Sequence, residues 1–100
     1  MKTPRHDWTE REISISVEAY LLMLRIQQSG TKPNKGVIRA VYLPQLRGTR
    51  TPGSWDRRMC NISAVFVEFG LPYVKGFKPL KNVGKNVRSQ IVRSTLRHLV

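Results

Sequence analysis

The chain has 100 residues, one cysteine, 40% hydrophobic residues and a formal net charge of +12. This length fits one small domain over residues 1–100. A single cysteine excludes both an intramolecular disulfide and a Cys-based metal site. The longest apolar run, Ala19–Leu24, has six residues, well short of the ~20 residues of a transmembrane helix, and residues 1–7 lack the apolar segment of a secretory signal. We therefore expect a cytoplasmic protein with no membrane partner, no metal and no cofactor.

The first predicted element is a helix over residues 9–28. Thr9 and Glu12 have the spacing of a capping box, in which each side chain bonds the backbone N–H of the other residue. Apolar residues then recur at helical spacing and cover more than one side of the helix. Gly30 provides a stop signal. The pattern predicts a helix that packs against several neighbours.

A second helix is predicted over residues 35–43, with Asn34 as its N-cap. Pro44 cannot continue the helix, because its ring clashes with the carbonyl four residues earlier. Residues 43–46 are therefore expected to form a kink or a separate turn. The predicted apolar face consists of Val37, Ile38, Val41 and Tyr42.

A third helix is predicted over residues 52–69. Thr51 and Pro52 fit the N-cap and the first helical position, and Gly70 fits a left-handed stop. The residues predicted to be buried are Trp55, Met59, Ile62, Phe66 and Phe69, and those predicted on the opposite side are Arg57, Arg58, Asn61 and Ala64.

Residues 73–84 are predicted to form a loop, because they are rich in Lys, Gly and Pro. Its aromatic residues, Tyr73 and Phe77, are expected to fold back onto the core. A last helix is predicted over residues 85–99. Since no strand pattern of useful length occurs, we predict an all-α, helix-turn-helix-like fold with a three-helix core over about residues 8–83 and a C-terminal helix.

The positive charge is concentrated in one part of the chain. Residues 1–30 hold four basic and four acidic residues, whereas residues 31–100 hold fourteen basic and two acidic ones. After Gly70 there are seven basic residues and no acid. Such one-sided charge favours a polyanionic partner.

The chain has few side chains of the kinds that catalyse reactions. We therefore expect no catalytic residue and no enzyme activity. A nucleophile needs a base within reach, and the chain offers only His6 and His98, both close to its ends. Asp56 and Glu68 are twelve residues apart on one predicted helix and cannot share a site. Cys60 is expected to be a packed or half-exposed thiol.

A DNA-binding surface is predicted around the third helix. The basic turn at residues 47–50 leads into the N-terminus of this helix, which can hold a phosphate. Arginine can read guanine and asparagine can read adenine in a major groove, and lysines of the loop can hold phosphates. The predicted contacts are Arg50, Arg57, Arg58, Asn61, Lys75, Lys78 and Lys81.

Several segments resemble a known family. They are Trp8 through Lys35, Arg50–Ser54, Asn61–Val65, Gly70–Tyr73 and Gly76–Pro79 with Asn82. Together they resemble the N-terminal DNA-targeting module of bacterial restriction-like and defence proteins, which precedes HNH nuclease or other effector domains. A looser likeness is to trihelical Myb-type domains. The resemblance covers about residues 8–83 and implies DNA near Arg50, Arg57, Arg58 and Asn61, with an effector protein or nuclease domain as a further partner.

Two other functions remain open. An RNA-binding or ribosome-associated protein would be indifferent to major-groove sequence and sensitive to the ribose. An interaction subunit or inhibitor would dock its basic face on an acidic protein. Because no effector domain follows before Val100, the chain is expected to be an excised module, a phage- or element-borne solo form, or a subunit.

Overall fold

A computed structural model describes residues 8–46 and 50–99. These residues form α1 (Glu10–Gln28), α2 (Lys35–Tyr42), the short 3₁₀ turn η1 (Leu43–Gln45), α3 (Pro52–Glu68) and α4 (Lys85–Leu99). The described ranges contain four α-helices and no strand, which confirms the all-α prediction. The N-terminal segment 1–7 and positions 47–49 of the predicted basic turn lie outside the described residues.

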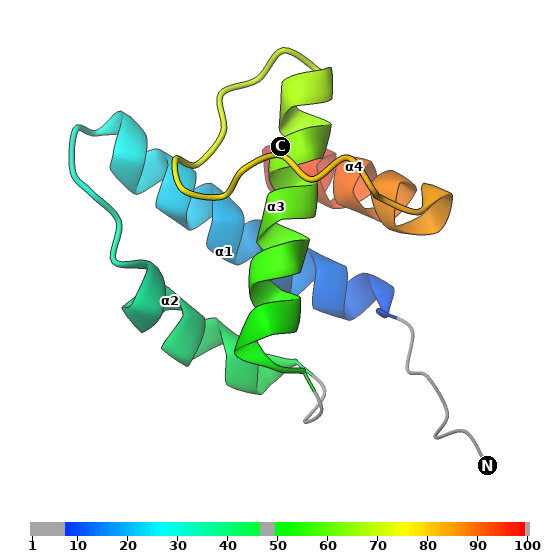
Figure 1. Cartoon of the computed structure of the whole chain (residues 1–100), viewed down its shortest axis with the longest axis horizontal. Helices are drawn as coiled ribbons and strands as arrows, with labels where there is room; N and C mark the ends of the chain where they lie inside the picture. Colours follow the sequence, from blue (N-terminus) through cyan, green and yellow to red (C-terminus); the bar gives the residue numbers. More distant parts are fainter. Residues whose placement is uncertain (1–7, 47–49, 100) are drawn as a thin grey trace.

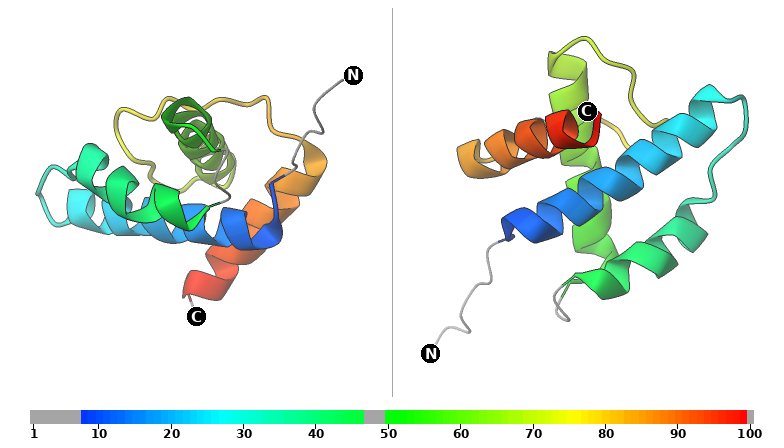
Figure 2. Two further views of the ribbon diagram at one scale, coloured as in Figure 1. Left: turned by 90° about the horizontal axis from the view of Figure 1, so that it is seen from below. Right: turned by 180° about the vertical axis from the view of Figure 1, so that it is seen from behind.

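Helix α1 is the central element of the fold. It packs against α2, α3 and α4, and α4 also contacts α3. Figure 1 shows α3 crossing in front of α1, and Figure 2 shows the same crossing from behind. The irregular segment that follows α3 returns across this helix before α4 begins. The fold thereby places the lysine-rich loop directly over α3.

The helix starts and stops follow the predicted caps. Thr9 and Glu12 form both bonds of a capping box, and Asn34 accepts the backbone N–H of Val37 at 3.0 Å. Thr51 accepts the backbone N–H of Ser54 at 3.1 Å, with proline at the next position. Gly70 has a φ of 71°, the left-handed conformation that a helix stop requires. Local side-chain chemistry therefore sets where these helices begin and end.

The core lies where α3 and α4 meet α1. Tyr20, Trp55 and Met59 are at most 1% exposed, and Ile91 of α4 is fully buried in the same cluster. Phe66 is buried as predicted, but the prediction for Phe69 is wrong, because this residue is 54% exposed. Helix α3 ends at Glu68. The apolar spacing in the sequence therefore continues one residue past the helix, to Phe69.

The predicted apolar face of α2 is also only partly buried. Ile38 is buried, whereas Val37 and Val41 are 57% and 58% exposed. The helix has eight residues and packs mainly on α1. A helix of about two turns that packs on one other helix buries only a narrow line of its side chains.

None of the helices in the described residues combines the length and the apolarity needed to cross a bilayer.

Candidate nucleic-acid interface

Loop 73–84 is held against α3 by backbone contacts. The N–H of Leu80 donates to the carbonyl oxygen of Cys60 at 3.0 Å. The side-chain amide of Asn61 donates to the carbonyl oxygen of Leu80 at 2.9 Å. Both backbone groups of Leu80 are thus bonded to consecutive residues of α3, which fixes the middle of the loop.

Helix α1 holds the start of the loop. The Tyr20 hydroxyl accepts the backbone N–H of Val74 at 2.9 Å and lies 2.7 Å from the Ser63 hydroxyl. Burial raises the pKa of Tyr20, although both hydrogen bonds oppose that shift, so this phenol is protonated at neutral pH.

Gln27 adds a second connection between α1 and the loop. Its amide oxygen accepts the N–H of Lys75 at 2.8 Å, and its amide nitrogen donates to the carbonyl of Tyr73 at 3.1 Å. Phe77 is buried as predicted, whereas Tyr73 is 39% exposed. The loop is therefore irregular in conformation but tied to two helices.

The lysines of this loop face solvent. Lys75, Lys78 and Lys81 are all exposed. Among the described residues, no carboxylate forms an ion pair with any of them. The fixed backbone therefore presents three positive charges without local neutralisation, and their contact with a nucleic acid stays a prediction.

The N-terminus of α2 adds two lysines that the sequence analysis missed. The ammonium of Lys35 lies 5.2 Å from the centre of the Phe77 ring, and it also lies against Gly76. Lys32 and Lys35 line a shallow hollow with Pro33 and Asn34. The signal in the sequence is a pair of lysines around the N-cap Asn34, since a helix N-terminus favours anions.

The prediction for Asn61 is wrong in its placement. We expected this residue on an exposed ridge of the helix, but it is 3% exposed. Ala64, predicted on the same side, is 8% exposed. Loop 73–84 covers this side of α3, as Figure 1 shows. Asn61 holds the loop instead of facing a base, and Arg57 is the member of the predicted α3 set that is exposed.

Arg50 is also engaged inside the protein. Its Nε donates to Glu12 at 2.8 Å and its Nη2 donates to the other carboxylate oxygen at 3.0 Å. The two side chains are 10% and 4% exposed. The bidentate geometry and the burial make this pair a structural contact between α1 and the start of α3. The predicted phosphate contact of Arg50 is not favoured by this placement.

Arg58 is half-buried near the same pair. Its guanidinium and that of Arg50 each lie over the Trp8 ring, 4.5 Å from its centre. Arg58 also donates to the side-chain oxygen of Asn61 at 3.1 Å. Burial first, and then the charges of Arg50 and Arg57, lower the pKa of Arg58 to about 10. The group still carries its charge at neutral pH.

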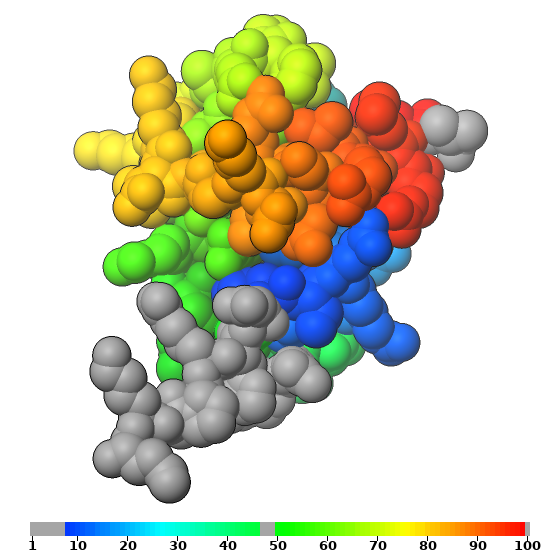
Figure 3. Space-filling model, turned by 90° about the vertical axis from the view of Figure 1, so that its right-hand side faces the viewer, coloured from blue at the N-terminus to red at the C-terminus, as the bar shows by residue number. Residues whose placement is uncertain are grey.

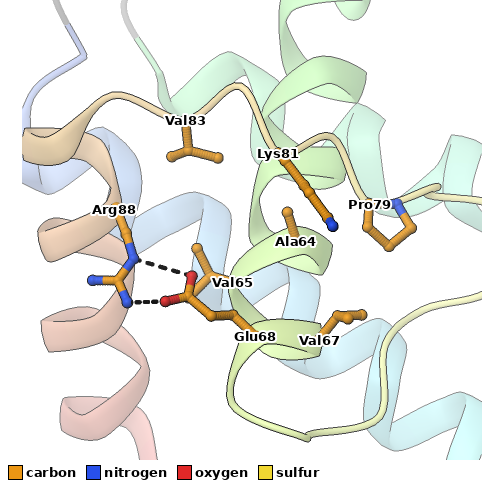
Figure 4. A pocket seen from close by; sticks show the side chains of 8 residues that line it. All are labelled: Ala64, Val65, Val67, Glu68, Pro79, Lys81, Val83 and Arg88. Atoms are coloured by element: carbon orange, nitrogen blue, oxygen red, sulfur yellow. Dashed lines mark hydrogen bonds and ion pairs between the residues drawn. The ribbon is translucent and has the colours of Figure 1, made fainter.

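A cavity of about 340 Å³ lies between α3, the loop and the start of α4 (Figure 4). Its walls are mostly apolar, with Lys81 on one side and the Arg88–Glu68 ion pair on the other. The bond from Arg88 lowers the pKa of Glu68 and keeps this carboxylate ionised. Arg88 is already paired with Glu68, so Lys81 is the cation lining this cavity that remains available to an external anion.

The described residues contain no group of three His, Cys, Asp or Glu side chains that could hold a metal ion. Cys60 is a free, half-buried thiol, as expected. Burial, and to a smaller extent the charge of Asp56, raises its pKa, so it is protonated at neutral pH.

Scans against protein-family models, curated proteins and solved structures found no match to this chain. The resemblance to DNA-targeting modules stays a prediction.

The role of Asn61 leads to a stability prediction. Replacing Asn61, which is itself buried, with alanine leaves the carbonyl of Leu80 without its donor and removes an acceptor from Arg58. We expect the free energy of unfolding to fall by about 1–3 kcal/mol in urea denaturation. Asn82→Ala, at an exposed position of the same loop, should change it by less than about 0.5 kcal/mol. Equal stability of the two variants would contradict the buried anchoring role.

Proposed function

We propose that this chain binds double-stranded DNA, with loop 73–84 as the main phosphate-binding element. The observation that carries the proposal is the set of three exposed lysines on an anchored loop, with no carboxylate partner among the described residues. A net charge of +12 supports the same partner class.

Helix α3 contributes less than the sequence pattern predicts. Arg57 is exposed and can contact a phosphate or a guanine. Asp56 is exposed beside it and reduces the local positive charge. With Asn61 buried, contacts to phosphates dominate over contacts to base edges, and such contacts position a protein without specifying a sequence.

RNA is the second candidate, because the exposed contact set consists of cations. Cations engage phosphates of either nucleic acid, and A-form RNA is recognised mostly through phosphates and 2′-hydroxyls.

A salt series tests the proposal. If four to six cations contact phosphates, the plot of log K against log salt should have a slope of roughly −4 to −5 on a short duplex. The double variant Lys75→Ala/Lys78→Ala should make this slope shallower by about two units. The matched control, Arg93→Ala/Arg97→Ala, removes the same charge from α4, where both arginines pair with Glu10.

The control should retain a slope close to that of the natural chain. A slope near zero for the natural chain would remove the polyanion proposal. Equal effects of the two double variants would show that only total charge matters and not the loop. A duplex RNA of the same sequence, if bound more tightly at equal salt, would replace DNA as the partner.

A further inference from the structure

An apolar groove of about 220 Å³ lies between the C-terminal ends of α3 and α4. Three large side chains at this groove are more than half exposed: Phe69 at 54%, Leu96 at 59% and Leu99 at 66%. Leu71 of the groove is 42% exposed. Figure 3 shows α4, in orange and red, below the yellow-green end of α3. Four of the exposed large hydrophobic side chains of the described residues are thus gathered at this end.

The size of this surface fits a small interface. At 42–66% exposure, the four side chains present roughly 400 Å² of apolar area. This area is in the range of the largest apolar patch on a monomer, and such a patch is often functional. When two such surfaces face each other, the total buried area, with the polar rims included, reaches the lower end of the range for specific interfaces.

The charges around the groove differ from those of the loop. Arg88 binds Glu68, and both Arg93 and Arg97 lie within 3.5 Å of Glu10. Both signs of charge therefore surround the groove, whereas the loop carries exposed lysines alone. A protein partner that is itself strongly basic can approach this surface without meeting a field of like charge.

We propose that the partner is a second copy of this chain, bound through this groove about a two-fold axis. In such an interface each copy offers the same surface, and it must carry both the protruding and the receiving parts. Leu96 and Leu99, which are more than half exposed, form the α4 side of the groove and can insert into the groove of a second copy, whose other side is formed by Phe69 and Leu71. Every copy has a net charge of +12, and two copies repel each other less beside α4, where Glu68 and Glu10 offset arginines, than across the exposed lysines of the loop.

The dimer does not depend on nucleic-acid binding, and salt separates the two. Higher salt screens the repulsion between two basic copies and strengthens dimerisation, whereas it weakens binding to a polyanion. Because weak, transient complexes lie at the lower end of interface size, we expect a dissociation constant on the order of micromolar.

Sedimentation equilibrium of the 100-residue chain tests the proposal, from about 1 µM to about 1 mM protein at low and high salt. We expect a monomer–dimer equilibrium with tighter association at high salt. Leu96→Lys should raise the dissociation constant at least about tenfold. Val41→Lys is the matched control, because Val41 on α2 is 58% exposed, and it should leave the constant unchanged. Circular dichroism of both variants checks that they are folded.

A natural chain that stays monomeric over the whole range at both salts would overturn the proposal. Equal weakening of the association by Leu96→Lys and Val41→Lys would also overturn it. So would an average molecular mass that rises past that of a dimer without reaching a plateau. None of these outcomes bears on the salt slope for DNA, so the two proposals can fail separately.

Discussion

Phe66→Ala is expected to lower the free energy of unfolding by about 3–5 kcal/mol, because it removes a buried aromatic ring and leaves a cavity. Phe66 is 3% exposed, and its ring packs edge-on against Tyr20 with the centroids 5.1 Å apart. A domain of this size has a total stability of roughly 5–15 kcal/mol. The loss would therefore consume a large share of it and lower the melting temperature by about 4–8 °C per kcal/mol.

The control is a phenylalanine on the same helical stripe. Phe69 lies three residues later and is 54% exposed, so Phe69→Ala removes the same atoms from a half-solvated site. We expect the melting temperature to change far less than in Phe66→Ala, as measured by circular dichroism. Similar losses in the two variants would mean that the stripe is buried along its whole length and that α3 continues past Glu68.

Glu12→Gln is expected to cost about 3–5 kcal/mol, because it removes the charge that faces a buried guanidinium. Glu12 and Arg50 form a bidentate pair with side chains 4% and 10% exposed, and Arg58 adds a further positive charge nearby. Glutamine keeps the shape of the side chain and can still act in the capping box. The expected loss therefore reports on charge and not on the helix cap.

Glu68→Gln is the matched control for this charge removal. Glu68 also binds one arginine, but that pair is half-exposed, and exposed ion pairs contribute little to stability. Urea denaturation should therefore show no measurable change for Glu68→Gln. If both glutamine variants were equally stable, the Glu12–Arg50 pair would have no structural role.

The helices were predictable because their signals are local. The ends of α1 and α3 depend on caps that lie within three residues of their partners, such as Thr9 with Glu12 and Thr51 with Ser54. The buried side of α3 follows from apolar spacing as far as Phe66. Where the prediction was wrong, at Phe69, the spacing continued beyond the point where the helix stops.

The candidate site was harder to predict because its polar residues have distant partners. Arg50 bonds a carboxylate 38 residues away, and Asn61 bonds a carbonyl 19 residues away. An arginine or asparagine in a basic chain looks available for a nucleic acid until the tertiary structure supplies an internal partner. The lysines of the loop contrast with them, since a long ammonium side chain stays in water at the surface.

In loop 73–84, the backbone atoms hold the loop in place, and the side chains at positions 75, 78 and 81 are left to contact a ligand. The hydrogen-bonding groups that hold it are the side chains of Tyr20, Gln27 and Asn61 and the backbone carbonyl of Cys60, and they bond only backbone atoms of the loop. Every residue type except proline offers the same backbone N–H and C=O groups, so positions 75, 78 and 81 can change to any residue but proline without losing these bonds. The chain therefore has a display site whose ligand preference can evolve, or be redesigned, on an unchanged scaffold.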